Sequence, residues 1–149
     1  MIIPWTAQPS PDGIKPESWR IRLLVKLSPL TGLSHAAFFQ VVLDTGALWT
    51  TFTEDFGRAS GITDIQSGRA TSVRWFGVDH DAWQHRIRMT VALDPSAQDT
   101  VTLEAVDVLF MKGFSHPVTK RNVSLAVLGM DCLTQLRFTL DGPSAVIRF

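Results

Sequence analysis

The chain has 149 residues, with 14 acidic and 14 basic side chains and a formal net charge of zero. This length fits one domain, and the balanced charge argues against nucleic acid or a charged membrane surface as a partner. No apolar run reaches membrane-spanning length, and the single cysteine, Cys132, rules out an internal disulfide and fits a reducing compartment. We therefore expect a soluble, cytoplasmic protein whose partners are peptides or proteins.

The N-terminal part predicts an arm followed by a β-hairpin. Residues 1–18 carry four prolines among polar side chains, which favours an extended arm over a regular element. Apolar and polar residues then alternate from Trp19 to Leu27, the pattern of a half-buried antiparallel strand. The run Ala36–Leu43 is apolar at all but one position, which predicts a strand buried on both faces. Residues 19–149 are therefore expected to form the folded domain.

The buried strand ends in the stretch Asp44-Thr45-Gly46-Ala47. A carboxylate at the end of such a strand costs free energy unless it is paired, hydrogen-bonded or used in chemistry. Asp-Thr-Gly is also ordinary turn chemistry, because Asp and Thr form local hydrogen bonds and Gly tolerates positive φ. Taken alone, the tripeptide is therefore compatible with a structural turn as well as with an active site.

The central part predicts a short helix and a long β-hairpin. Trp49 is expected to pack in the core, with contact to a bound ligand as the less favoured alternative, and Thr53 is expected to cap a helix that ends at Gly61. Residues 71–93 have the pattern of a strand, a turn and a second strand. After one or two further strands between Val101 and Phe110, residues 111–122 predict an exposed loop.

A second buried-type strand begins at Leu125 and stops at Gly129. It leads directly into a short helix, which Asp131 is expected to cap. A turn at residues 141–143 then precedes a last strand, Ala145–Phe149. Many short strands with two small helices predict an all-β, barrel-like domain.

Two stretches of this chain, each a buried strand with the segment directly after it, occur in the same order as two motifs of the retropepsin-like aspartic proteases. The chain therefore resembles this family, the single-domain relatives of pepsin. The resemblance covers Arg20 to Phe149 and implies a single-domain retropepsin-like acid-protease β-barrel with one or two short helices, including one near the C-terminus. In that family the Asp of Asp-Thr-Gly is catalytic, and the later strand packs beside the active-site loop before it leads into the C-terminal helix. The resemblance therefore implies that Asp44, Thr45 and Gly46 form the catalytic motif, with Thr45 and Gly46 holding the Asp44 carboxylate in place.

Such an enzyme requires two carboxylates, because one must accept a proton from water while the other, protonated, polarises the peptide carbonyl. This chain contains a single Asp-Thr-Gly. The resemblance thus implies a homodimer in which Asp44 of each subunit meets across a two-fold axis. The implied activity is that of an aspartic endopeptidase acting on extended peptide or protein substrates, without a metal or cofactor. The alternative is a catalytically inactive dimerising or peptide-binding module of the same fold, with Asp44 as a structural turn residue.

The hairpin within residues 71–93 resembles, by its position, the flap that closes over bound peptide in this family. On this interpretation Gly77 is a candidate for the tip, and Phe76, Val78 and Trp83, with Ala47 beside the catalytic motif, contact the substrate. The alternative is a plain surface hairpin in which Trp75 and Trp83 form a cross-strand aromatic pair. The same hairpin contains Asp79-His80-Asp81 and His85, which are metal-ligand residue types. On a hairpin tip such residues are usually solvated, and no metal site is expected.

Overall fold

The computed structural model describes the backbone of residues 2–4, 6–8, 18–20, 22–32, 36–94, 96–116, 118–141 and 144–148. Side chains are described within residues 22–136 of these ranges. Residues 1, 5 and 9–17 of the predicted N-terminal arm, part of the turn at residues 141–143 and the last residue of the predicted final strand lie outside the described residues.

Within the described residues, the chain forms strands of varied length, two α-helices and one turn of 3₁₀-helix, η1 (Ile65–Ser67). The α-helices are α1 (Glu54–Ala59) and α2 (Met130–Leu133). Neither is long or apolar enough to cross a membrane, and no other helix within the described residues is. The strands are β1 (Ile2–Pro4), β2 (Thr6–Gln8), β3 (Ser18–Arg20), β4 (Arg22–Ser28), β5 (Phe39–Leu43), β6 (Thr51–Thr53), β7 (Arg69–Trp75), β8 (Val78–Ala92), β9 (Thr100–Met111), β10 (Phe114–Ser115), β11 (Asn122–Val123), β12 (Ala126–Leu128), β13 (Arg137–Asp141) and β14 (Ser144–Arg148).

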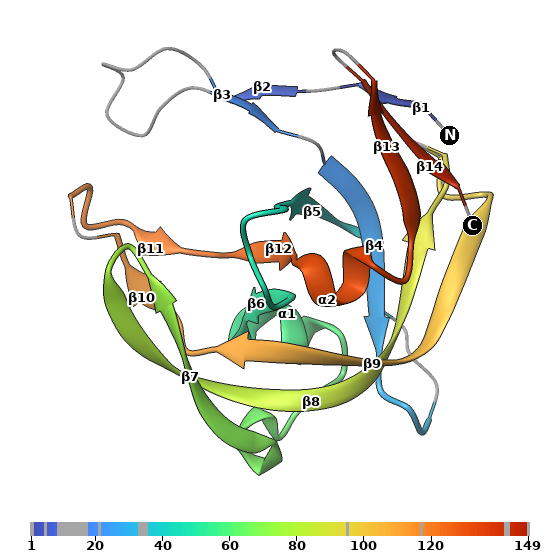
Figure 1. Ribbon diagram of the computed structural model, residues 1–149. Helices are drawn as coiled ribbons and strands as arrows, with labels where there is room; N and C mark the ends of the chain where they lie inside the picture. Colours follow the sequence, from blue (N-terminus) through green and yellow to red (C-terminus); the bar gives the residue numbers. More distant parts are fainter. Residues whose placement is uncertain are drawn as a thin grey trace.

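Six strands close into a barrel in the order β4, β5, β12, β6, β9, β8, because β4 pairs with both β5 and β8 (Figure 1). The strand β7 joins this sheet as an additional partner of β8. Two short helices complete the domain, one of them near the C-terminus. These observations confirm the predicted all-β barrel with short helices.

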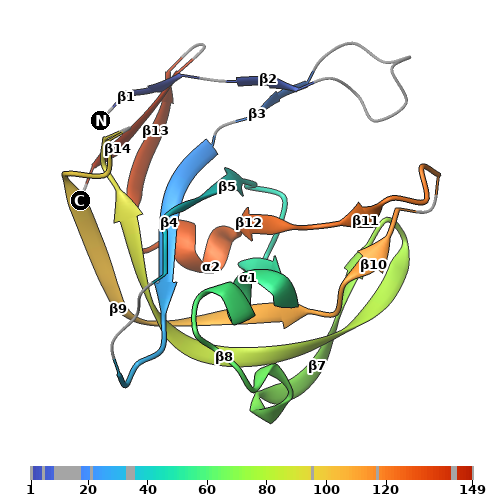
Figure 2. The ribbon, with the colours of Figure 1, turned by 180° about the vertical axis from the view of Figure 1, so that it is seen from behind.

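The long strand β8 belongs both to the barrel and to the hairpin with β7. Its first half pairs with β7, its second half with β4, and β9 runs along most of its length. A register shift between Ile87 and Met89 interrupts the pairing with β9, and such irregularities bend a strand and increase its twist. The curve of β8 is seen in Figures 1 and 2, where it extends from the β10–β11 region to the opposite side of the barrel.

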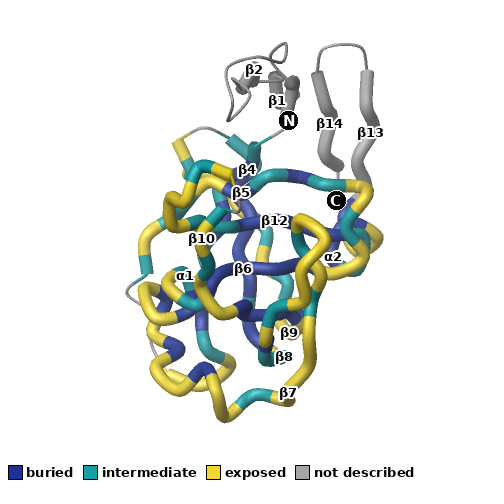
Figure 3. The backbone as a smooth tube through the Cα atoms, turned by 90° about the vertical axis from the view of Figure 1, so that its left-hand side faces the viewer, coloured by how far each residue is buried: buried dark blue, intermediate teal, exposed yellow. Residues whose placement is uncertain are grey.

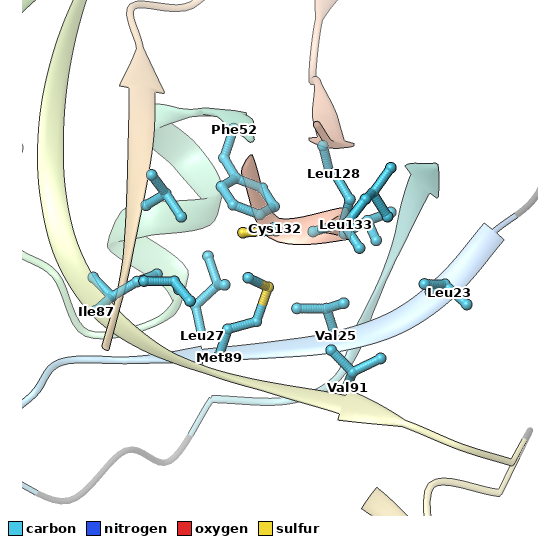
Figure 4. Packing of buried hydrophobic residues seen from close by; sticks show 14 of the residues in the cluster. Leu23, Val25, Leu27, Phe52, Ile87, Met89, Val91, Leu128, Cys132 and Leu133 are labelled. Atoms are coloured by element: carbon cyan, nitrogen blue, oxygen red, sulfur yellow. The ribbon is translucent and has the colours of Figure 1, made fainter. Parts of the chain in front are cut away.

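The barrel interior is filled by side chains from all its walls. The alternation in β4 places Leu23, Val25 and Leu27 inside, as predicted from the period of two. Figure 4 shows these side chains facing residues of β8, β6, β12 and α2, among them Phe52 and Leu133. Figure 3 shows the contrast between buried β6 and β12 and the largely exposed β7. Burial of this apolar surface supplies the main driving force for folding.

The segments outside the barrel also form strands. The segment Ile2–Pro4 pairs with β14 of the same chain, and β14 pairs with β13, which gives a three-stranded sheet. The strands β2 and β3 pair with each other. The stretch 1–18 thus contains the short strands β1 and β2, whereas the sequence favoured an extended arm over a regular element.

Cys132 is a buried core residue of α2, and its chemistry depends on that burial. Burial raises the pKa of the Cys132 thiol to about 12. Because this value lies above the ordinary value of 9.0, the thiol contributes stability fully below about pH 9, and the contribution is lost as the pH rises toward 12. We expect a thiol-specific reagent at pH 8 to label the native protein at least about 10²-fold more slowly than the urea-unfolded protein. Equal labelling rates would contradict this burial.

Candidate active site

The site is built where two strands from distant parts of the sequence end side by side. The strands β5 and β12 are parallel neighbours, with Leu43 opposite Leu128. Parallel strands end at the same edge of a sheet, so Asp44 and Gly129 lie next to each other. The Asp44 N–H donates a hydrogen bond to the Leu128 carbonyl at 3.0 Å. The two stretches that the sequence singled out are therefore in direct contact.

The turn after β5 fixes the Asp44 carboxylate. The Gly46 N–H donates to Asp44 Oδ1 at 2.8 Å, and the Ala47 N–H donates to the Asp44 carbonyl at 3.2 Å. A Cβ atom at position 46 would lie 3.2 Å from the same Oδ1, so glycine leaves room for the carboxylate. Asp44 is half-buried, whereas Thr45 and Gly46 are exposed. The predicted motif thus forms a tight turn that holds a carboxylate at the surface of the barrel.

The start of α2 holds the other end of this loop. The Met130 N–H donates to the Ala47 carbonyl at 2.8 Å, and the Asp131 N–H donates to the Leu48 carbonyl at 3.2 Å. At Gly129 the two backbones approach so closely that a Cβ atom would lie 2.4 Å from the carbonyl carbon of Trp49. Backbone contacts with residues 128–131 therefore hold the loop at Asp44 and again from Ala47 to Thr50.

A polar network between Thr50 and Asp131 completes this attachment. One Asp131 oxygen accepts from the Thr50 hydroxyl at 2.7 Å and from the Cys132 N–H at 2.7 Å, and both oxygens accept from the Thr50 N–H. The Thr50 hydroxyl in turn accepts from the Gly129 N–H at 3.0 Å. The prediction that Asp131 caps the helix is wrong, because Gly129 occupies the N-cap position. The carboxylate instead connects the first turn of α2 to the loop 44–50.

We expect Thr50→Val to lower the free energy of unfolding by about 2 kcal/mol or more. The substitution keeps the shape of a completely buried side chain but leaves the Gly129 N–H without its acceptor and removes one bond to a carboxylate. Urea denaturation measures the change. Thr71→Val, at an exposed position of β7, is the matched control. Equal stability of the two variants would show that the network is unimportant.

The helix cap predicted at Thr53 also differs from the prediction. Thr53 is the N-cap residue of α1, as predicted, but its side chain makes no capping hydrogen bond. Its hydroxyl instead accepts from the Leu125 N–H at 3.0 Å, just before β12. The hydroxyl therefore links the ends of β6 and β12 rather than satisfying the helix.

A cleft of about 480 Å³ separates the Asp44 loop from β7. Its lining includes Asp44, Gly46 and Ala47 on one side and the segment 72–75 of β7 on the other. Leu48 and Trp49 also line the cleft, and their side chains are 74% and 51% exposed. The expected core packing of Trp49 is therefore wrong, and sequence analysis missed Leu48 altogether. The only sequence signal was their position directly after the Asp-Thr-Gly-Ala stretch.

The β7–β8 hairpin ends in a two-residue turn at Phe76 and Gly77, the predicted tip. Both residues have positive φ, of 51° and 75°, as a tight hairpin turn requires. Next to the turn, the Arg74 guanidinium forms two hydrogen bonds with Asp79 at 2.9 and 3.1 Å, which lowers the pKa of this exposed carboxyl. Phe76 and Val78 are 55% and 52% exposed. The hairpin therefore presents apolar side chains at its tip.

The structure does not bring every predicted contact residue to this cleft. Trp83 packs against the main core and is not part of the cleft lining. The alternative cross-strand pair is wrong as well, because Trp75 lies opposite Val78 and Trp83 opposite Ala70. Trp75 itself lines the cleft, and its indole Nε1 is buried without a hydrogen-bond partner among the described residues.

The histidines of β8 have separate surroundings. His85 Nε2 lies 2.6 Å from the Ile65 carbonyl, and its ring packs against Phe110, so it has a structural place beside η1. The ring of His80 lies against Phe114. Within the described residues no three side chains of His, Cys, Asp or Glu are grouped so that they could hold a metal ion.

The prediction of an exposed loop at residues 111–122 is partly wrong. This stretch contains β10 and leads into β11, which form an antiparallel pair beside the tip of the β7–β8 hairpin (Figures 1 and 2). The Phe76 ring lies 6.1 Å from Phe114 and 5.0 Å from His116. Sequence analysis missed this hairpin because its strands are two residues long and carry no alternating pattern.

The barrel order and the two short helices define the retropepsin-like fold. Among solved structures, the chain is similar to a retropepsin-like aspartic protease from Rickettsia conorii, with a TM-score of 0.58 over 99% of this chain and 88% of that chain. The sequence identity is 13%, so this likeness shows the fold alone. No family model matches the sequence, and no match is found among curated proteins.

Proposed function

We propose that the chain is an aspartic endopeptidase that acts as a homodimer, with Asp44 of each subunit forming the catalytic pair. One observation carries this proposal: the single Asp-Thr-Gly forms a rigid turn in which Gly46 donates to Asp44 Oδ1, at the floor of a cleft beneath a β-hairpin. The similarity in fold to an aspartic protease supports it. Thr45 and Gly46 belong to the catalytic motif because they shape this turn.

The pair needs a second subunit because one carboxylate cannot act as acid and base at once. Two carboxyl groups a few ångströms apart share one proton. The ionised group accepts a proton from water as the water oxygen attacks the carbonyl carbon, while the protonated group donates its proton to the carbonyl oxygen. The resulting tetrahedral diol collapses when the first carboxyl returns its proton to the peptide nitrogen and the second takes a proton from a diol hydroxyl. The C–N bond breaks, and the pair is left with one shared proton as before. The two-fold axis of a dimer supplies the second Asp44.

The cleft fits an extended peptide. The strand β7 faces the Asp44 loop across the cleft and offers a strand edge for main-chain hydrogen bonds. Leu48, Trp49, Val73 and Trp75 provide apolar lining. Ala47 borders the floor, and Gly77, Phe76 and Val78 form the flap tip above a bound peptide. This lining favours substrates with large apolar side chains beside the scissile bond.

The test is cleavage of an unstructured protein such as casein from mildly acid to neutral pH, with and without pepstatin, together with sedimentation. We expect pepstatin-sensitive cleavage from a species that sediments as a dimer. The specific activity should fall on dilution as the dimer dissociates. A monomer that cleaves at no pH would overturn the shared pair and favour the alternative, an inactive peptide-binding module of this fold.

A further inference from the structure

The tip of the β7–β8 hairpin carries a residue that its backbone does not favour. A two-residue turn with positive φ at both positions prefers Asn-Gly or Gly-Gly. Here Phe76 stands at the first position with φ 51°. A bulky side chain in this left-handed region strains the backbone, and such strain persists where surrounding contacts hold it. The Phe76 ring therefore needs contacts that hold the turn in this conformation.

The ring lies against the β10–β11 hairpin of the same chain. Its centroid is 5.0 Å from that of His116, at an interplanar angle of 67°, and 6.1 Å from that of Phe114. Further along β8, the His80 ring lies 4.3 Å from Phe114. Edge-on and tilted ring pairs at these separations are attractive. The four rings join the tip of one hairpin to the other, as Figure 2 also shows for the two hairpins.

The β10–β11 hairpin has contacts of its own that fix the positions of the His116 and Phe114 rings. His116 Nδ1 accepts from the N–H groups of Val118 and Thr119, both at 3.2 Å, which fixes the orientation of its ring. The His116 N–H donates to the Arg121 carbonyl at 2.8 Å, closing the end of the hairpin. At its base, Phe114 packs on a small buried cluster of Ala82, Leu109 and Met111.

We propose that the β10–β11 hairpin is a latch for the β7–β8 hairpin, and that Phe76 is the positioning residue that holds the tip in place. In the latched arrangement residues 72–75 of β7 form one wall of the cleft beside Asp44. The latch therefore maintains the cleft in the absence of substrate, within one subunit. Its importance for peptide binding rests on the proposed protease function, but the latch itself does not.

Hydrogen exchange followed by mass spectrometry on the unliganded protein tests the latch. Phe76→Asn improves the turn, because Asn adopts positive φ readily, and removes the ring. We expect peptides covering residues 72–80 and 113–124 to exchange about three- to tenfold faster in this variant, with the rest of the barrel unchanged. Phe76→Tyr keeps the ring and should exchange like the wild type. Unchanged or slower exchange in Phe76→Asn would overturn the proposal.

A second variant weakens the latch without changing Phe76, which the proposed function places above the bound peptide. Phe114 does not line the cleft, so Phe114→Leu weakens the latch while leaving the cleft surface intact. We expect the same faster exchange at residues 72–80, and in a cleavage assay a severalfold higher KM with kcat nearly unchanged. An unchanged KM together with faster exchange would overturn the role in binding. If the wild type cleaves nothing, the exchange result still decides the latch, so the two proposals fail separately.

Discussion

Replacing Asp44 by Asn is expected to lower peptide-bond cleavage by at least about 10³-fold. The amide cannot accept a proton from water, and neither subunit of a homodimer retains a carboxylate at this position. The turn itself should persist, because an amide oxygen can still accept the Gly46 N–H. Dimer stability should be kept or improved, since the substitution removes the need to bring two carboxylates together.

Asp107→Asn, at an exposed position of β9, is the matched control and should cleave like the wild type. Cleavage by both variants and the wild type is compared on one substrate, and sedimentation gives the fraction of dimer. A dimeric Asp44→Asn variant that retains most of the activity would refute Asp44 as the catalytic group. Loss of dimer in this variant alone would show that the carboxylate is needed for assembly.

Replacing Gly129 by Ala is expected to lower the free energy of unfolding by about 3 kcal/mol or more, at or above the upper end for overpacking. The added Cβ would lie 2.4 Å from the Trp49 carbonyl carbon, 2.6 Å from its oxygen and 2.8 Å from the Thr50 nitrogen. These are backbone atoms, so no side-chain rotation relieves the contact. The loop 44–50 must move, and with it the cleft floor.

Gly113→Ala is the control, because a Cβ there meets nothing within 4 Å. Urea denaturation of the two variants gives the difference in stability, and the cleavage assay shows whether the loop remains functional. If Gly129→Ala unfolds at the same urea concentration as Gly113→Ala, the close approach of the two backbones is not required. A stable but inactive Gly129→Ala variant would place the effect on loop geometry alone.

The centre of the site was predictable because its two halves carry strong local signals. An unbroken apolar run that stops at Asp44, and another that stops at Gly129, mark buried strands whose ends differ chemically from their interiors. The side-by-side placement came from the family resemblance. The Thr50–Asp131 network was not predictable in this way, because a Thr and an Asp 81 residues apart carry no pattern of their own.

The less accurate predictions concern positions at which tertiary contacts outweigh local pattern. Asp131 has the residue type of a helix cap, but a nearby Thr50 offers it stronger partners. The register of β7 and β8 is set by the two-residue turn at Phe76, which separates Trp75 from Trp83. Trp49 has a core-type side chain, yet the backbone contacts of the loop leave it in the cleft.

The pairing of β5 with β12 also governs when the site can form during synthesis. The bonds that hold the Asp44 loop come from residues 128–131, which are synthesised only after most of the barrel strands that lie between them and Asp44. Contacts so distant along the chain also form slowly, because a long loop must close first. On a ribosome the emerging β5 can pair with β4, but the Asp-Thr-Gly turn lacks its neighbour β12 until residues 126–131 have also emerged. If the proposed function holds, the catalytic turn is therefore completed only once this later segment has been made.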